Sequence, residues 1–189
     1  MKKRLVGLTG SMASGKSTAL HCLASCGAYT LSADELVREL YKTAPVRCRL
    51  EKWFATTDTE KIAREVFSSP KKRKQLEDFL HPLVWQLAQK KLTAAPVSWA
   101  VFEIPLLFEA KWDERVDVTV LITASAKTIT SRLKARGISL QQYRERRQTQ
   151  LSEAEKISRA DMVVYNDGTK TDLEIKMKRL YQALSTLYA

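Results

Sequence analysis

Residues 10–17 read Gly-Ser-Met-Ala-Ser-Gly-Lys-Ser, and this stretch decides how the rest of the 189-residue chain is interpreted. It fits the P-loop pattern of Gly, four residues, Gly-Lys and then Ser or Thr. The apolar run Leu5–Thr9 before it predicts a buried strand, and Ser17–Cys26 after it predicts a helix. Strand, glycine-rich turn and helix therefore occur in the order in which this pattern binds phosphate.

Each residue type in the pattern has a role in phosphate chemistry. The glycines let the backbone approach a ligand closely, so that successive N–H groups converge on a polyphosphate at the start of a helix. Lys16 then reaches the outer phosphates, and the hydroxyl of Ser17 ligates Mg²⁺. The alternative, a Gly/Ser-rich turn with an ordinary surface lysine, does not account for the flanking strand and helix. The residues expected to hold the nucleotide are Gly10, Ser11, Met12, Ala13, Ser14, Gly15, Lys16, Ser17 and Thr18.

Composition limits the class of protein. The length suits one domain, or one core with a lid-like insertion. Lys and Arg number 32 against 21 Asp and Glu, a formal charge of +11, which predicts polyanionic partners without separating nucleotides from nucleic acid. Cys22, Cys26 and Cys48 indicate small core residues in a reducing compartment, so a cytoplasmic location is expected. No apolar run is long enough to predict a membrane span.

Two carboxylates follow predicted strands. Asp34 comes just after the strand expected at 28–31, at the sheet edge where ligands bind in open α/β folds. It can orient and deprotonate an acceptor hydroxyl during phosphoryl transfer, or it can be a helix-start acid without chemistry, and the residues alone leave both open. Glu103 lies near the end of the strand expected at 98–104, where it can hold Mg²⁺ through water.

The central part of the chain predicts helices. Residues 43–60 indicate only a loop or a short helix, whereas 60–67 and 70–80 indicate helices. His81-Pro82 predicts a break before a further helix to about residue 92. A lone histidine at such a junction is more often a local hydrogen-bonding residue than a ligand for an anion.

A basic helical segment separates the strands expected at 116–122 and 162–165. It contains helices expected at 126–136 and from about 139, and a capping box at Ser152–Glu155 begins another. Such a segment can close as a lid and bring guanidinium groups onto phosphate, although exposed mixed-charge helices explain part of the pattern. The arginines concerned are Arg132, Arg136, Arg144, Arg146, Arg147 and Arg159. Strands alternate with helices along the chain, which predicts an α/β fold with a mostly parallel five-stranded sheet covered on both faces.

Taken together, the motifs resemble those of the dephospho-CoA kinase family over nearly the whole chain. The most specific are His81-Pro82-Leu83 and Ile104-Pro105-Leu106-Leu107-Phe108-Glu109, in this order and spacing. Further matches are Ala33-Asp34 with Arg38, the run 64–67, Gln150-Leu151-Ser152 with Glu155-Lys156, and Arg159-Ala160-Asp161 leading to Asn166. The resemblance implies a three-layer P-loop kinase with a core of about 1–42, 93–124 and 160–189, a CoA-binding helical insertion of about 43–92 and a lid of about 125–159.

The resemblance also implies an activity and its residues. The family transfers the ATP γ-phosphate to the ribose 3′-hydroxyl of dephospho-CoA. Lys16 and Ser17 would serve ATP and Mg²⁺, with Glu103 as a second metal-side residue. Asp34 would be the base or aligner for the hydroxyl, and Asn166 would border the adenine. Arg38, His81, Pro105 and Leu106 would lie on the acceptor side, and Arg146 would be a lid arginine.

The chain departs from the family pattern in three places. Ser32 replaces the first acid of the usual Asp-Ala-Asp, and Met12 and Ala13 are bulkier than the usual Gly-Ile-Gly of the loop interior. Residues 54–61 are shorter than usual. The alternatives are a nucleoside or nucleotide kinase of the same core, and a non-kinase P-loop NTP-binding protein; no Asn-Lys-x-Asp guanine motif occurs. The expected partners are ATP and dephospho-CoA, with no nucleic acid or membrane, in a monomer or weak homo-oligomer.

Overall fold

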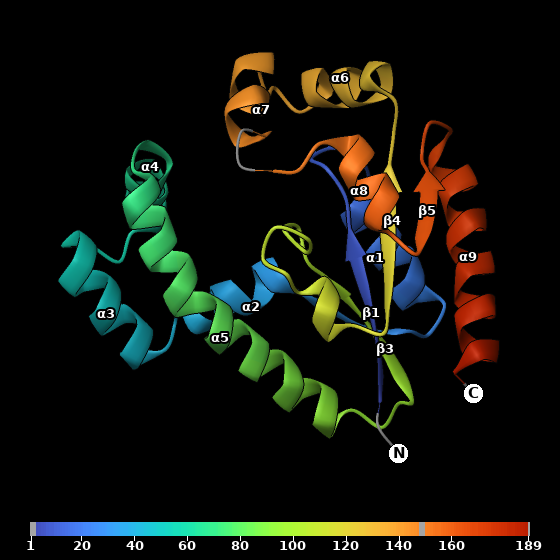
Figure 1. Cartoon of the computed structure of the whole chain (residues 1–189), viewed down its shortest axis with the longest axis horizontal. Helices are drawn as coiled ribbons and strands as arrows, with labels where there is room; N and C mark the ends of the chain where they lie inside the picture. Colours follow the sequence, from blue (N-terminus) through green and yellow to red (C-terminus); the bar gives the residue numbers. More distant parts are fainter. Residues whose placement is uncertain (1–2, 148–149, 189) are drawn as a thin grey trace. The chain divides into compact units, whose positions relative to one another are not determined.

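A computed structural model describes residues 3–147 and 150–188 of the chain. It has an α/β fold, as predicted, and Figure 1 labels its elements. The chain divides into two compact units, one formed by residues 1–31 and 96–189 and the other by residues 32–95.

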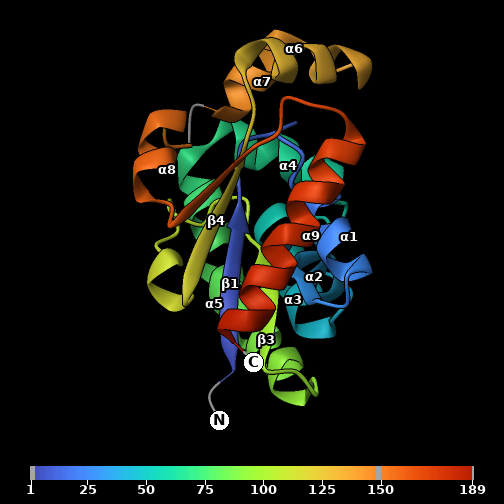
Figure 2. The same ribbon diagram turned by 90° about the vertical axis from the view of Figure 1, so that its right-hand side faces the viewer.

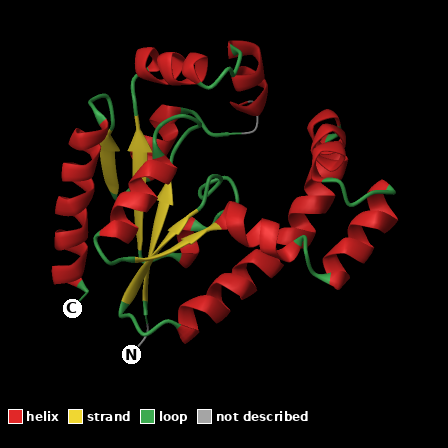
Figure 3. Ribbon diagram, turned by 180° about the vertical axis from the view of Figure 1, so that it is seen from behind, coloured by secondary structure: helices red, strands yellow, loops and turns green. Residues whose placement is uncertain are grey.

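The first unit is built on the sheet. Its order is β2-β3-β1-β4-β5, and the pairs β1–β3, β1–β4 and β4–β5 are parallel. Figure 3 shows the strand arrows running in the same general direction, so their carboxyl ends lie at a common edge. The predicted five-stranded parallel sheet is therefore confirmed, and its strands are β1 (Arg4–Thr9), β2 (Tyr29–Ser32), β3 (Trp99–Glu103), β4 (Val118–Thr123) and β5 (Met162–Tyr165).

Helices α1 (Lys16–Ser25) and α9 (Lys170–Leu187) pack on one face of this sheet (Figures 1 and 2). Leu23 and Met177 contribute to a core that Val6, Val101 and Ile122 supply from the strands. Strands β1 and β3 are apolar along nearly their whole length because both faces of a parallel sheet are covered.

The basic segment between β4 and β5 is helical, as predicted. Its elements are α6 (Ala126–Ala135), α7 (Leu140–Arg147) and α8 (Glu153–Arg159), and a short 3-10 turn, η1 (Asp113–Arg115), precedes β4. The capping box predicted at residues 152–155 is present: the Ser152 hydroxyl accepts from the Glu155 N–H, and the Glu155 side chain accepts from the Ser152 N–H. Gly137, with φ of 68°, separates α6 from α7.

The second unit is helical and has its own core. Its helices are α2 (Ala33–Leu40), α3 (Ala44–Phe54), α4 (Thr59–Ser68) and α5 (Pro70–Ala94). Buried side chains of α3, α4 and α5 form the core, among them Leu50, Ile62 and Leu80. Helix α3 lies in the stretch for which the sequence left loop and short helix open.

The predicted helix break at His81–Pro82 is wrong. Helix α5 runs continuously for 25 residues with Pro82 inside it. Proline removes one backbone hydrogen bond and costs about 3 kcal/mol in a helix interior. Leu76, Leu80, Val84, Ala88 and Leu92 are buried along one side of the helix. Their burial on both sides of Pro82 offsets the local loss.

The second unit begins at Ser32, earlier than the insertion expected at 43–92, because α2 packs against α5. The functional roles of these regions stay a prediction. Within residues 3–147 and 150–188, we find no helix with the length and apolar character required to cross a membrane.

Candidate functional site

The loop between β1 and α1 has the geometry of an anion-binding turn. Gly10 and Gly15 have φ of 152° and 107°, values that side chains disfavour. A Cβ on Gly10 would lie 2.2 Å from the Ile122 carbonyl oxygen, and one on Gly15 would lie 2.2 Å from Asn166 Nδ2. The backbone angle therefore favours glycine at both positions, and at position 10 the close approach of a backbone oxygen requires it as well; at position 15 a side chain would force Asn166 to move.

Contacts inside the loop close it into a turn. The Ser14 N–H donates to the Ser11 carbonyl at 3.2 Å, and Lys16 Nζ donates to the same oxygen at 3.1 Å. Helix α1 begins at Lys16, so the first N–H groups of the helix face the loop without intrahelical partners. The loop thus presents backbone N–H groups, a helix N-terminus and a lysine to a bound anion.

Met12 and Ala13, which depart from the family pattern, pack against helix α6. Ala13 is buried in a cluster with Ile129 and Leu133 of α6, and Met12 packs against the same cluster. Ala13 has a positive φ of 63°, a left-handed conformation that costs a residue with a side chain about 1–2 kcal/mol. Burial of its methyl group offsets part of that cost.

Ser17 and Glu103 meet beside the loop. The Ser17 hydroxyl donates to Glu103 Oε1 at 3.4 Å, and Glu103 is only 6% exposed. Hydroxyl and carboxylate oxygens are ligands that Mg²⁺ accepts, usually with water and phosphate oxygens completing the shell. Among the described residues, no group of three or more His, Cys, Asp or Glu side chains is placed to hold a metal. The Ser17–Glu103 pair therefore fits a cation that also binds phosphate.

Asn166 lies against the back of the loop. It is buried at the end of β5, its N–H donates to the Thr123 carbonyl at 2.7 Å, and its Nδ2 donates to the Ser14 carbonyl at 2.7 Å. Arg132 of α6 donates to the backbone carbonyls of Ala13 and Ser14 in the P-loop and of Asn166 itself. The predicted nucleotide-side residue thus contacts the P-loop directly.

Helix α8 joins several parts of the site. Glu153 accepts from the Ser11 hydroxyl at 2.5 Å and from the Thr123 hydroxyl. Lys156 is fully buried and pairs with Glu109 at 3.1 Å. The sequence indicated Glu153 only as part of the predicted capping box and as a possible acidic partner for nearby arginines, because the partners it has in the structure lie 142 and 30 residues away along the chain.

Pro105 and Leu106 lie in the turn after β3, in the same unit as the P-loop. Both are half-buried, and the Pro105 carbonyl accepts from the Thr9 hydroxyl at 3.3 Å. Their expected contact with the acceptor stays a prediction.

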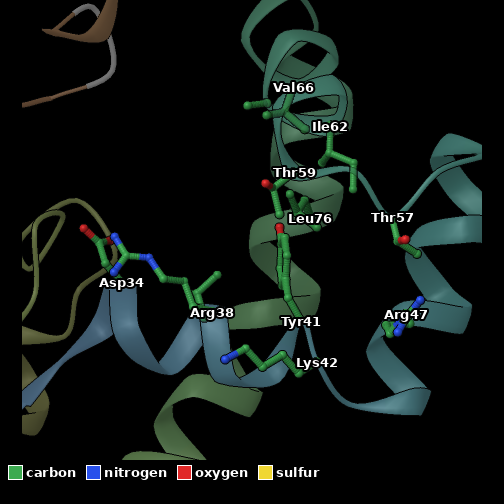
Figure 4. A pocket seen from close by; sticks show the side chains of 12 residues that line it. Asp34, Arg38, Tyr41, Lys42, Arg47, Thr57, Thr59, Ile62, Val66 and Leu76 are labelled. Carbon is green, nitrogen blue, oxygen red and sulfur yellow. The ribbon is translucent and has the colours of Figure 1, made fainter.

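The second unit contains a cavity of about 720 Å³. In Figure 4, Asp34 and Arg38 lie on one side of it, Arg47 and Thr57 lie on the other, and Tyr41 stands between them. Burial raises the pKa of the Tyr41 phenol. The charged residues that line the cavity are Asp34, Arg38, Lys42 and Arg47, and the apolar ones are Val37, Ile62, Ala63, Val66 and Leu76. The cavity therefore combines an excess of cationic groups with an apolar wall.

Asp34 and Arg38 lie on successive turns of α2, and both line the cavity; their roles toward an acceptor stay a prediction. Asp34 is exposed in the first turn, and Ser32 occupies the N-cap position without a side-chain capping bond. Ser32 therefore does not take over the hydrogen bonding of a capping acid. His81 is half-buried on α5 and is not among the residues that line the cavity. The side chain of Arg146 lies outside the described residues.

Comparisons with known proteins agree with one another. The family model of dephospho-CoA kinase (CoaE) matches residues 4–172. A dephospho-CoA kinase of Thermus thermophilus is 34% identical, with 96% of this chain and 92% of that protein aligned. The crystal structure of TT1252 from Thermus thermophilus matches with a TM-score of 0.87 at 33% identity, covering 100% of both chains. The fold is also that of the dephospho-CoA kinase from Campylobacter jejuni, which has a TM-score of 0.73 at 24% identity and 98% coverage of both chains. With a P-loop after β1, a hydroxyl–carboxylate pair beside it and a family match over most of its length, this chain belongs to the dephospho-CoA kinase family.

Proposed function

We propose that this protein transfers the γ-phosphate of ATP to the ribose 3′-hydroxyl of dephospho-CoA, giving coenzyme A. The observation that carries the proposal is the anion-binding turn at residues 10–16, with Ser17 and Glu103 beside it. The identity of the acceptor, dephospho-CoA, is inferred from membership of the family. A cytoplasmic location and a monomeric or weakly associating state are part of the same proposal.

On the donor side, the chain binds and orients the triphosphate. The loop N–H groups and the N-terminus of α1 hold phosphate oxygens, and Lys16 neutralises charge on the outer phosphates. When bound at Ser17 and Glu103, Mg²⁺ supplies electrostatic stabilisation of the phosphate oxygens. Phosphate passes directly to the acceptor in line, without a phosphorylated residue. Asn166 borders the nucleotide from the loop after β5, and Arg146 serves as a lid arginine.

On the acceptor side, the cavity of the second unit matches the chemistry of dephospho-CoA. Arg38, Lys42 and Arg47 are cationic against the single acid Asp34, and the remaining wall is partly apolar. Dephospho-CoA has an anionic pyrophosphate and a long, weakly polar arm, so it requires both kinds of lining. Asp34 aligns the acceptor hydroxyl and takes its proton. The family pattern also assigns His81, Pro105 and Leu106 to the acceptor side, although His81 is not among the residues that line this cavity.

Because Ser32 stands where the family usually has the first Asp of Asp-Ala-Asp, Asp34 is the one acid left in this motif. We therefore assign the carboxylate on the metal side to Glu103, which already accepts from the Ser17 hydroxyl. Glu103→Gln should raise the Mg²⁺ concentration needed for half-maximal activity by about 10- to 100-fold. An unchanged Mg²⁺ requirement would assign the metal to other groups.

The decisive assay supplies the purified protein with ATP, Mg²⁺ and dephospho-CoA, and in parallel with nucleoside monophosphates. We expect coenzyme A and ADP in equal amounts, with little transfer to the monophosphates. Robust transfer to a nucleotide without coenzyme A would reject the proposal in favour of a nucleotide kinase. ATP binding without transfer to any acceptor would favour a non-kinase NTP-binding protein.

A further inference from the structure

Arg132 connects helix α6 to two loops at the nucleotide site. Its NH1 group donates to the Ala13 carbonyl at 3.3 Å and to the Ser14 carbonyl at 3.1 Å, and its NH2 group donates to the Asn166 carbonyl at 2.9 Å. One guanidinium thus bonds to main-chain oxygens of the P-loop and of the loop after β5. A planar fork of N–H donors suits this task, whereas an ammonium group does not offer it.

Holding these carbonyls fixes the orientation of peptide groups. In a planar trans peptide, the C=O of one residue and the N–H of the next point in opposite directions. The Ser14 carbonyl points to Arg132, so the Gly15 N–H points away from it. The Ala13 carbonyl also points to Arg132, and the Ser14 N–H correspondingly turns inward to the Ser11 carbonyl at 3.2 Å. Arg132 therefore sets the directions of the N–H groups that shape the loop.

The Ser14 carbonyl has a second donor. Asn166 Nδ2 reaches it at 2.7 Å, and the same Nδ2 occupies the space beside Gly15. Position 15 has a left-handed φ of 107°, which glycine adopts readily and which the loop alone does little to restrict. Two donors on the preceding carbonyl restrict the peptide at this flexible point.

The loop that carries Asn166 is itself attached to α6. Asp167 accepts from the Ser125 N–H at 2.8 Å and from the Thr128 hydroxyl at 2.7 Å. These hydrogen bonds from Ser125 and Thr128 lower the pKa of Asp167 to about 2. Arg132 and Asp167 thus fix the same loop to two points of one helix, and the cluster of Ala13 with α6 adds an apolar contact.

We infer that Arg132 is a positioning residue of the nucleotide site, which orients the P-loop peptides for phosphate binding. This inference rests on the proposed function, because it takes ATP as the ligand of the loop. It separates Arg132 from the other lid arginines, for which a contact with the transferring phosphate is expected. A residue that preorganises the loop affects every ligand with a phosphate seated there, ADP included, whereas a transition-state contact affects turnover.

The test compares Arg132→Ala, Arg132→Lys and the matched control Lys134→Ala, which removes an exposed cation from the same helix. ADP affinity is measured by titration calorimetry, and inorganic tripolyphosphate is tested as a competitive inhibitor against ATP. We expect Arg132→Ala to weaken both ligands by about 10- to 100-fold, since hydrogen bonds from a charged donor are lost. Arg132→Lys should fall between, and Lys134→Ala should match the wild type. At saturating ATP, kcat should change less than about threefold, and the KM for dephospho-CoA should stay the same.

Three results would overturn the inference. Unchanged ADP affinity with a large loss of kcat would make Arg132 a contact of the transferring phosphate. Weakened ADP with unchanged tripolyphosphate inhibition would make it a contact of the nucleoside. Equal losses in Arg132→Ala and Lys134→Ala would make the effect one of net charge.

Thermal unfolding without ligand checks that Arg132→Ala is folded. A failure of the proposed function is distinct, because the wild type itself would then not form coenzyme A.

Discussion

Replacing Lys156 by methionine would leave the carboxylate of Glu109 buried without its counter-charge. Lys156 is 0% exposed and Glu109 is 13% exposed, with 3.1 Å between Nζ and Oε1. The Leu151 N–H also donates to Oε1, but Oε2 is buried and has no hydrogen-bond partner within the described residues. The ammonium group is therefore the main stabilising neighbour of this carboxylate.

The expected loss in the free energy of unfolding of Lys156→Met follows from the distance between the two charges and their burial. At 3.1 Å the attraction between unit charges is about 5 kcal/mol for an effective dielectric constant of about 20. Part of this only offsets the desolvation of the two groups, and losing one partner of a buried pair costs about 3–5 kcal/mol. For a chain of this size, the loss corresponds to a fall in the unfolding midpoint of roughly 6–20 °C.

A double variant separates charge from packing. Lys156→Met with Glu109→Gln removes both charges and keeps an oxygen that accepts from Leu151, so most of the stability should return. Urea unfolding followed by tryptophan fluorescence measures the change, in a background where Trp53 and Trp85 are phenylalanine, so that Trp99 and Trp112 report on the first unit. Lys178→Met, at an exposed position of α9, is the control and should stay within about 0.5 kcal/mol of the wild type. A loss below about 1 kcal/mol for Lys156→Met, or no recovery in the double variant, would refute the reasoning.

Three further predictions concern the site and its acid sensitivity. Gly15→Ala should abolish nucleotide binding in calorimetry, because its Cβ would lie 2.2 Å from an amide nitrogen, whereas Gly137→Ala, with no atom within 4 Å of its Cβ, should bind normally. Asp34→Asn should keep ATP affinity and lose most turnover, whereas Lys16→Ala should lose both; near-normal turnover of Asp34→Asn would reduce Asp34 to a helix-start acid. The pKa of Asp167 is lowered to about 2, so its stabilisation is complete above the ordinary aspartate pKa and is lost as pH falls from about 4 towards 2. Melting curves should therefore show a shallower acid loss for Asp167→Asn, and identical slopes would count against this assignment.

The elements of the fold follow largely from local sequence. β5 was predicted with the same bounds as observed, and the Ser152 capping box begins α8 as expected. Both depend on neighbouring residues, whose spacing the sequence displays directly. The predicted helix break at Pro82 was wrong because burial of residues before and after Pro82 on α5 offsets its local cost. That burial depends on packing in the folded chain, which no local sequence pattern shows.

The sequence by itself determined the P-loop, its position after the first strand and the family to which the chain belongs, because these depend on residue types at short, set spacings. Tertiary structure decided what holds the loop: Arg132 and Asn166 reach the Ser14 carbonyl from positions 118 and 152 residues away. It also decided the pairing of Lys156 with Glu109 and the lining of the cavity beside Asp34. A backbone carbonyl accepts a hydrogen bond from whichever donor lies near it in the folded chain. Such contacts therefore have no sequence signature and form only when the chain folds.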